Sequence, residues 1–220
     1  GEVSIPLITT NRINDPKVAE DIIARGDADM VSMARPFLAD AHLVKKAEEG
    51  REDEINTCIA CNQACLDHVF QRKIVSCLVN PRACHETELN YTPTSTKKKI
   101  AVVGAGPAGL AAATVAAERG HEVTLFEADK EIGGQFNIAK QIPGKEEFYE
   151  TIRYFNTKIK KHGVDLRLNT RANEAALSGF DEVLLGTGIT PRTPSIQGID
   201  HPMVLSYLDV LRDKKKVGKR

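Results

Sequence analysis

The sequence predicts an α/β protein made of two α/β parts, with a cysteine-rich segment between them. Three patterns lead to this prediction. Short apolar runs alternate with helical patterns over residues 1–50, four cysteines gather within residues 58–77, and a glycine-rich turn joins a strand to a helix after Lys99. With 220 residues, 41% of them hydrophobic, the chain can build one large core or two small ones.

The charge balance excludes some classes of function. Thirty basic residues face 30 acidic ones, so the net charge is zero, whereas a nucleic-acid-binding protein normally carries a strongly basic surface. The lysine runs at 97–99 and 214–216 are short and typical of solvated flanks. No apolar run approaches membrane-spanning length and no secretory signal opens the chain, so we expect a cytoplasmic protein without a membrane partner. A reducing compartment would also keep thiols available to metal.

Residues 1–50 are predicted to fold as strand, helix, strand, helix. The expected elements are a strand at 5–9, a helix opened by Asp15 and Pro16 and ending at Arg25 before Gly26, a strand at 28–33, and a helix at 42–49. This alternation implies a parallel sheet or barrel, in which functional residues lie where a strand passes into the next loop. Arg12 and Arg35 occupy such positions, although surface ion pairs would explain both arginines equally well.

Four cysteines have the spacing Cys-x2-Cys-x3-Cys-x11-Cys, namely Cys58, Cys61, Cys65 and Cys77. A helix is expected over 62–71, and on a helical turn Cys61 and Cys65 would share a face. An iron-sulfur cluster needs four thiolates, commonly three close together and one remote, and the spacing favours this interpretation. A zinc site usually presents two short Cys-x2-4-Cys pairs, and zinc or buried unliganded cysteines stay open as alternatives. A disulfide framework suits small secreted chains, and Cys84 is expected to be a packed or free thiol.

The second α/β part begins after a polar stretch that contains Pro93, and we place a linker at residues 91–98. An apolar strand at 100–103 runs into Gly104-Ala105-Gly106-Pro107-Ala108-Gly109, followed by a helix at 110–119 and a strand at 122–126 that ends on Glu127. This complete unit is a strong dinucleotide-binding fingerprint, since glycines let the backbone approach a pyrophosphate at the helix N-terminus. Glu127 would bind a ribose diol and repel a 2′-phosphate, which favours FAD or NAD(H). Close strand-helix packing alone would need only the third glycine.

The remaining elements are expected in regular alternation. They are a tight loop at 132–135, a long amphipathic helix at 145–162, a strand at 164–168, a helical turn at 174–177, a buried strand at 182–185, and a short helix opened by a capping-box-like Ser206 and Asp209.

With these motifs in place, the chain resembles the iron-sulfur flavoprotein branch of the old yellow enzyme superfamily, and within it the bacterial 2,4-dienoyl-CoA reductases that use NADPH. The resemblance extends over nearly the whole chain. The stretches that carry it are 32–40, the cysteine segment 58–67, 77–82, the glycine turn 104–109, 133–136 and 142–148. Trimethylamine dehydrogenases are similar in layout, but they have one residue fewer between the second and third thiols.

The resemblance implies a fold and a function. Residues 1–50 would be the C-terminal end of an FMN-binding (β/α)8 barrel, 51–90 an iron-sulfur segment, and 99–220 the first part of a Rossmann-like FAD-binding domain, with the NADPH domain following residue 220. In this family NADPH reduces FAD, and single electrons pass through a 4Fe-4S cluster to FMN. The FMN then reduces a 2,4-dienoyl-CoA thioester in fatty acid β-oxidation.

The resemblance also assigns residues to cofactors. Arg12, Ala34 and Arg35 match positions around the FMN phosphate, and Cys58, Cys61, Cys65 and Cys77 match the cluster ligands. The 104–109 turn, Glu127 and Gln135 match FAD contacts, with Ala172 a backbone contact near the adenine.

No residue of this chain matches the catalytic tyrosine and histidine of the family. The chain also begins without methionine, so we expect a fragment that is inactive toward enoyl-CoA on its own. The alternatives are another NAD(P)H:flavin oxidoreductase, an enoate reductase-like or trimethylamine dehydrogenase-like member, a non-catalytic FAD or electron-transfer module, and a nucleotide domain with a zinc clip.

Overall fold

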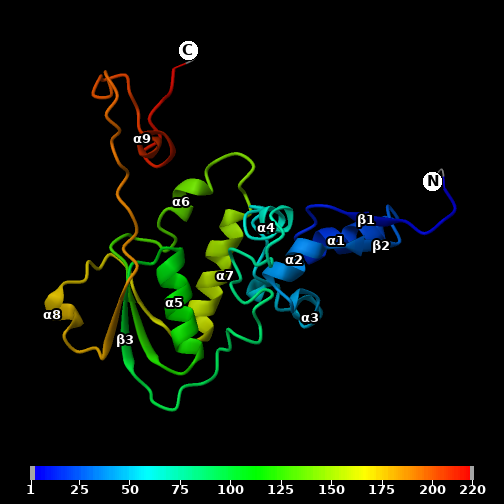
Figure 1. Ribbon diagram of the computed structural model, residues 1–220, viewed down its shortest axis with the longest axis horizontal. Coiled ribbons are helices and arrows are strands. Elements are labelled where there is room, and N and C mark those ends of the chain that lie inside the picture. The colour runs from blue at the N-terminus through cyan, green and yellow to red at the C-terminus, as the bar shows by residue number, and fades with distance from the viewer. Residues whose placement is uncertain (1–2, 219–220) are drawn as a thin grey trace. The chain divides into compact units, whose positions relative to one another are not determined.

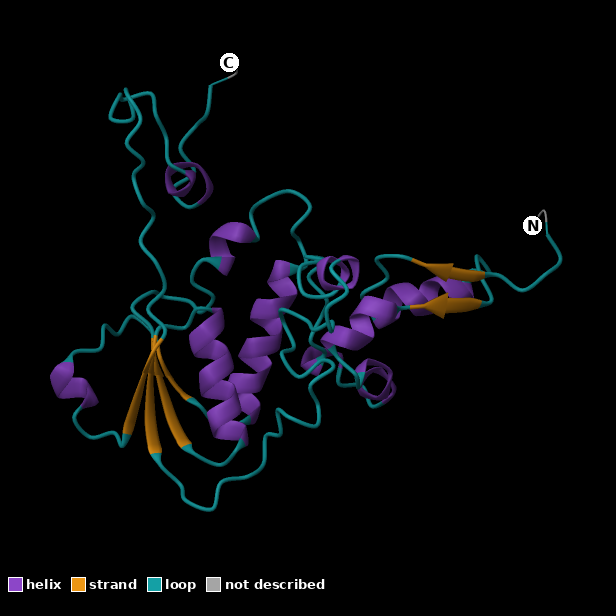
Figure 2. Cartoon of the chain, viewed as in Figure 1, coloured by secondary structure: helices purple, strands orange, loops and turns teal. Residues whose placement is uncertain are grey.

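The computed structural model describes residues 3–218 (Figures 1 and 2). The chain forms two compact units: the first contains residues up to Thr92 together with Arg153–Lys158, and the second contains Pro93–Ile152 and the residues from Ile159 onward. Among the described residues, none of the helices combines the length and the apolar character needed to cross a bilayer.

The first unit follows the predicted alternation of strands and helices. Its elements are β1 (Ile8–Thr10), α1 (Pro16–Ala24), β2 (Met30–Ser32), α2 (Ala34–Ala39), α3 (Leu43–Glu48), the 3-10 helix η1 (Glu52–Glu54) and α4 (Leu66–Phe70). Strands β1 and β2 are parallel, with Thr9 opposite Val31. The Asp15 side chain caps α1 by accepting a hydrogen bond from the Lys17 N–H, and Pro16 lies in the first turn, as predicted.

Helix α2 was not predicted from the sequence. Pro36 is the third residue of α2. The first N–H groups of a helix have no intrahelical acceptor, so proline is tolerated in the first turn. Helix α2 buries Pro36 and Ala39, and the core of the first unit continues with Leu43, Ile55 and Ala83.

The second unit is built on a four-stranded parallel sheet with the strand order β5-β4-β3-β6. Its elements are β3 (Lys99–Val103), α5 (Pro107–Glu118), β4 (Glu122–Phe126), α6 (Phe136–Ala139), α7 (Phe148–Lys161), β5 (Asp165–Arg167), α8 (Glu174–Leu177), β6 (Glu182–Leu185) and α9 (Tyr207–Leu211). Helix α5 packs on β3 and β4 (Figure 1). Ala101, Val102, Leu110, Leu125 and Phe126 are almost fully buried there.

Two predictions in this unit need correction and one is confirmed. Strand β6 has the predicted bounds, but all four of its residues are exposed because it pairs only with β3 at the sheet edge. An apolar run by itself does not distinguish an edge strand from a central one. Helix α7 begins at Phe148, and the short helix α6 was not predicted. The capping box of Ser206 and Asp209 is present at the start of α9.

Candidate functional site

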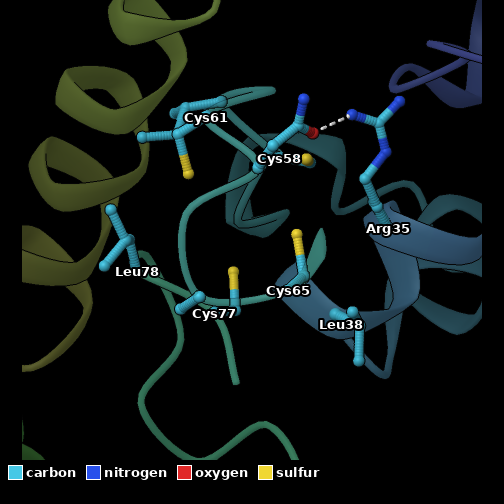
Figure 3. A pocket seen from close by; sticks show the side chains of 10 residues that line it. Arg35, Leu38, Cys58, Cys61, Cys65, Cys77 and Leu78 are labelled. Carbon is cyan, nitrogen blue, oxygen red and sulfur yellow. Dashed lines mark hydrogen bonds between the residues drawn. The ribbon is translucent and has the colours of Figure 1, made fainter. Parts of the chain in front are cut away.

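The four cysteines of the spaced motif line one pocket of the first unit (Figure 3). Figure 3 shows the sulfur atoms of Cys58, Cys61, Cys65 and Cys77 turned toward a shared space. All of them are free thiols, so the pocket contains no disulfide among these residues. Cys84 is exposed and does not line the pocket. The structure therefore brings together the four predicted ligands and leaves the fifth cysteine outside.

The backbone around the first three cysteines differs from the prediction. Helix α4 begins only at Leu66, and Ala60 and Asn62 have left-handed φ values of 52° and 61°. Two left-handed residues cannot belong to a right-handed helix, so the expectation that Cys61 and Cys65 share a helical face is wrong. An irregular loop presents these thiols instead. Cys77 joins them because the Ser76 N–H donates to the Ala64 carbonyl at 2.8 Å.

The surroundings of the thiols at the two ends of the motif favour their protonated form. Burial raises the pKa of Cys58 and Cys77 above the ordinary value, and nearby backbone N–H groups oppose this shift in part. Metal ions bind thiolates, so metal uptake would release these protons. No three His, Cys, Asp or Glu side chains among the described residues are close enough to share one metal ion. A cluster of several irons does not require such closeness, since each thiolate binds a different iron.

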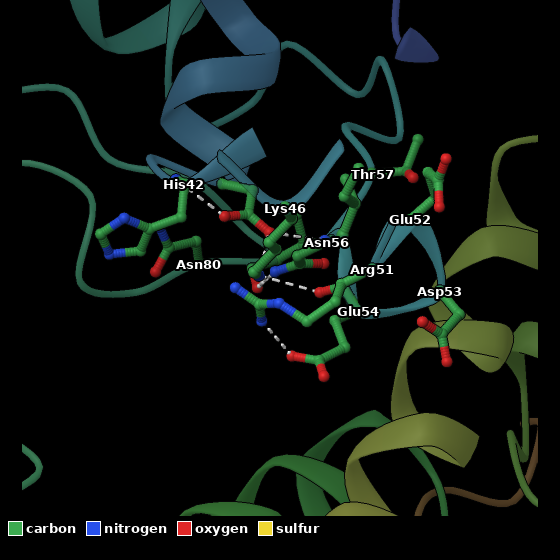
Figure 4. Close-up of polar contacts among 12 residues, drawn as sticks. His42, Lys46, Arg51, Glu52, Asp53, Glu54, Asn56, Thr57 and Asn80 are labelled. Carbon is green, nitrogen blue, oxygen red and sulfur yellow. Dashed lines mark hydrogen bonds and ion pairs between the residues drawn. The ribbon is translucent and has the colours of Figure 1, made fainter. Parts of the chain in front are cut away.

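A buried ion pair supports the loop that precedes the cysteines (Figure 4). The Asp40 carboxylate, whose side chain is 5% exposed, accepts from Lys46 Nζ at 2.5 Å. It also accepts from the backbone N–H groups of Asn56 at 2.9 Å and His42 at 3.0 Å. Lys46 Nζ donates further to the Glu54 carbonyl at 2.9 Å. Asp40 and Lys46 therefore bond to each other and also to backbone groups before, within and after the 3-10 helix.

Two asparagines tie the segment of Cys77 to other parts of the first unit, one to the same loop and one to α2. Asn56 Nδ2 donates to the Val79 carbonyl at 2.6 Å, and Asn80 Nδ2 donates to the Leu38 carbonyl at 2.9 Å. The sequence analysis missed both residues. The available signal was their position, since Asn56 stands two residues before the first cysteine of the motif and Asn80 three residues after the last.

Replacing Lys46 with methionine should lower the free energy of unfolding of the apo chain by about 3 kcal/mol, because it leaves the buried Asp40 carboxylate without its cation. Urea unfolding followed by far-UV circular dichroism measures this loss. Lys45→Met is the matched control: Lys45 is 68% exposed and its nitrogen lies 3.9 Å from Glu49, so we expect a change below about 0.5 kcal/mol. Equal losses in the two variants would contradict the prediction.

The residues expected around an FMN phosphate lie where β1 and β2 end. Arg12 follows β1 in a left-handed conformation with φ 53°, and Ala34 is the exposed first residue of α2. Arg35, the next residue of α2, lines the cysteine pocket and donates from Nη1 to Asn62 Oδ1 at 2.6 Å (Figure 3). The structure thus associates Arg35 with the cysteine loop, a contact that the sequence analysis did not predict.

The glycine-rich turn lies at the carboxyl ends of β3 and β6 in the second unit, where the strand order reverses and nucleotides bind in such sheets. A Cβ on Gly104 would lie 2.4 Å from the Gly186 carbonyl oxygen, and a Cβ on Gly109 would lie 1.8 Å from the Gly104 oxygen. These two glycines are required by packing within the protein. A Cβ on Gly106 would meet no atom within 4 Å, and Gly106 lines a broad pocket of this unit. Packing therefore does not explain the second glycine, which is the N-cap of α5 and lines the pocket.

The other residues expected at FAD divide between the pocket and the core. Gly104, Gly106, Pro107, Ala108, Glu127, Gln135 and Ala172 line the broad pocket, whereas Ala105 and Gly109 are buried and do not. Glu127 Oε2 accepts from the Ala105 N–H at 2.6 Å, and Oε1 accepts from the Asp129 N–H at 2.9 Å. Glu127 therefore also braces the glycine turn, which the sequence analysis did not foresee. Arg171 and Lys214 add positive charge to the lining.

Two family models match two separate parts of the chain. The model of the pyridine nucleotide-disulphide oxidoreductase family matches residues 98–219, which is more than half of the chain. The chain belongs to the pyridine nucleotide-disulphide oxidoreductase family. A second model, that of the NADH:flavin oxidoreductase / NADH oxidase family, matches residues 1–54. Both family models describe oxidoreductases.

Several relatives match nearly the whole length of this chain. It is 45% identical over 98% of its residues to a metal reductase of Desulforamulus reducens, and 38% identical over 99% to a cinnamate reductase of Clostridium sporogenes, covering 33% of each. The solved structure of 2-naphthoyl-CoA reductase with 2-naphthoyl-CoA matches with a TM-score of 0.91 and 41% identity, over 99% of this chain and 34% of that one. The chain thus spans about a third of the length of these relatives.

Proposed function

We propose that this chain is the electron-transferring part of a flavin-dependent oxidoreductase, in which Cys58, Cys61, Cys65 and Cys77 bind a 4Fe-4S cluster. The observation that carries the proposal is that four free thiols from two segments line one pocket. Four cysteine thiolates are the usual ligand set of such clusters. When bound, a cluster of this kind takes up and gives back single electrons, which suits exchange between carriers of two electrons.

The lining of the pocket supports this assignment. Leu38, Ile59 and Leu78 give the cysteines an apolar surrounding, in which Ile59 is buried and Leu78 is exposed. Backbone N–H groups of Val79 and Asn80 act on the Cys77 thiol against its burial and favour a lower pKa. Hydrogen bonds to the ligand sulfurs stabilise negative charge there, and they are one of the means by which proteins set a cluster potential.

Each flavin would use one of the two units. We assign FAD to the broad pocket at the glycine turn, where Gly106 permits close approach and Glu127 lines the wall. We assign FMN to the end of the β1 and β2 strands, where Arg12, Ala34 and Arg35 follow the two strand ends. The Arg12 guanidinium is a suitable phosphate ligand because a guanidinium can donate two parallel hydrogen bonds. The Arg35 guanidinium already donates to Asn62 and Asn11, so Arg35 would border the phosphate without forming such a pair with it.

For the whole protein, we propose reduction of 2,4-dienoyl-CoA thioesters with NADPH. The support is the motif resemblance over 32–40, 77–82 and 142–148, together with relatives named for the reduction of a CoA thioester and of cinnamate. Reductive turnover of a panel of dienoyl-CoA, cinnamate and aromatic acyl-CoA substrates would rank these substrates. Turnover of cinnamate without any of 2,4-dienoyl-CoA would contradict the substrate assignment and leave the cluster assignment unaffected.

Anaerobic reconstitution of this chain with iron and sulfide tests the central proposal. We expect about four iron and four acid-labile sulfide atoms per chain, with a brown colour, and an electron paramagnetic resonance signal after reduction. If the chain instead holds one zinc ion and no sulfide, the cluster assignment is wrong and the cysteines form a structural zinc site. Retention of neither metal would overturn both assignments. Flavin analysis of the same sample reports on the FAD and FMN pockets independently.

A further inference from the structure

The cysteine pocket contains a single charged side chain among its described lining residues, and it is Arg35. The rest of the lining consists of the four cysteines, the amide of Asn62, and apolar residues. Electrostatic interactions are stronger at a partly buried site than in open water, so a single cation in this lining has an effect on a nearby negative charge. Arg35 therefore stabilises any negative charge that develops on the cysteines.

The guanidinium is held in place by neutral partners. Nη1 donates to Asn62 Oδ1 at 2.6 Å, and Nη2 donates to Asn11 Oδ1 at 3.4 Å. Both recorded acceptors are amide oxygens, so neither neutralises the positive charge. Asn62 itself lies between Cys61 and Cys65 with a left-handed φ of 61°. The bond to Arg35 therefore fixes the turn of the cysteine loop as well as the position of the charge.

We propose that Arg35 is the residue that sets the reduction potential of the cysteine-bound cluster, through its charge, and that it positions the cluster loop through Asn62. This inference rests on the proposed function, because it requires a cluster in the pocket. Reduction adds one negative charge to a group that four thiolates already make anionic. A guanidinium nearby stabilises the reduced form more than the oxidised form, so Arg35 raises the potential.

The charge of Arg35 would act on an electron taken up by a cluster in this pocket, because Arg35 is part of the pocket lining. A lysine at this position separates the two roles of Arg35, its charge and its positioning of the loop. Lysine would keep the charge but could not bind both amides in the way that a guanidinium does.

A redox titration followed by electron paramagnetic resonance tests the proposal on the reconstituted chain, two Arg35 variants and one control variant. We expect Arg35→Gln to shift the midpoint potential to a more negative value, because the charge is lost. Arg35→Lys should keep the midpoint near that of the unmodified chain. Arg25→Gln is the matched control: it removes the same charge from an exposed site whose partner is Asp27, and it should leave the potential unchanged.

The outcomes separate this inference from the proposed function. If the unmodified chain binds no cluster, the proposed function fails. If it binds one and Arg35→Gln leaves the potential unchanged, or shifts it no more than Arg25→Gln does, the inference on Arg35 is wrong. If Arg35→Gln assembles no cluster while Arg35→Lys does so at the unmodified potential, the charge is required and the inference stands. Loss of the cluster in both variants would overturn the role of the charge.

Discussion

Serine in place of Cys58, Cys61, Cys65 or Cys77 should reduce the bound iron and sulfide by more than about tenfold after anaerobic reconstitution. Loss of an outer-shell partner alone typically costs about 10-fold to 100-fold in metal affinity, and loss of a ligand should cost more. A hydroxyl is a far weaker ligand than a thiolate, and these four thiols are the ones that line the pocket. Iron and sulfide analysis, together with visible absorbance, measures the loss.

Cys84→Ser provides the matched control for this series. Cys84 is exposed, lies outside the pocket, and is the remaining cysteine of the chain. We expect its variant to take up as much iron and sulfide as the unmodified chain. A full cluster in any one of the four pocket variants, or a missing cluster in the Cys84 variant, would show that the ligand set is assigned incorrectly.

Local sequence chemistry was sufficient to predict the β3–α5–β4 part of the second unit. Its glycine turn, the strand before it and the strand that ends on Glu127 follow within 28 residues of Ile100. The capping pairs at Asp15 and at Ser206 were equally readable, because a cap involves residues two or three positions apart. The parallel order of the sheet then follows from the alternation of strands with helices.

Long-range contacts account for what the sequence did not reveal. The spacing of the cysteines indicated a shared site, but the route of the loop depends on left-handed residues at Ala60 and Asn62. Left-handed non-glycine residues carry a steric cost and are sustained by their surroundings, here by the bond from Arg35 to Asn62 across 27 positions. The bond from Asn80 to Leu38 spans 42 positions. No pattern of neighbouring residues predicts such pairs.

Two glycines of the same turn should differ in how much an alanine substitution changes stability. Gly109→Ala should destabilise the second unit by about 3 kcal/mol, because the new methyl group would lie 1.8 Å from the Gly104 oxygen and the backbone must move. Gly106→Ala should change stability by less than about 0.5 kcal/mol, since its φ of −74° suits alanine and no atom lies within 4 Å of the new methyl group. Urea unfolding followed by circular dichroism separates the two.

FAD binding should instead be sensitive to Gly106. An added methyl group at Gly106 would project where the pyrophosphate needs to approach the backbone, so we expect at least about tenfold weaker binding of FAD. Isothermal titration calorimetry with FAD measures the loss on a variant whose unfolding curve is unchanged. If Gly106→Ala binds FAD as well as the unmodified chain, the second glycine does not contact the ligand. FAD would then have to bind the broad pocket in another orientation. The test concerns Gly106 alone, because packing within the protein already accounts for Gly104 and Gly109.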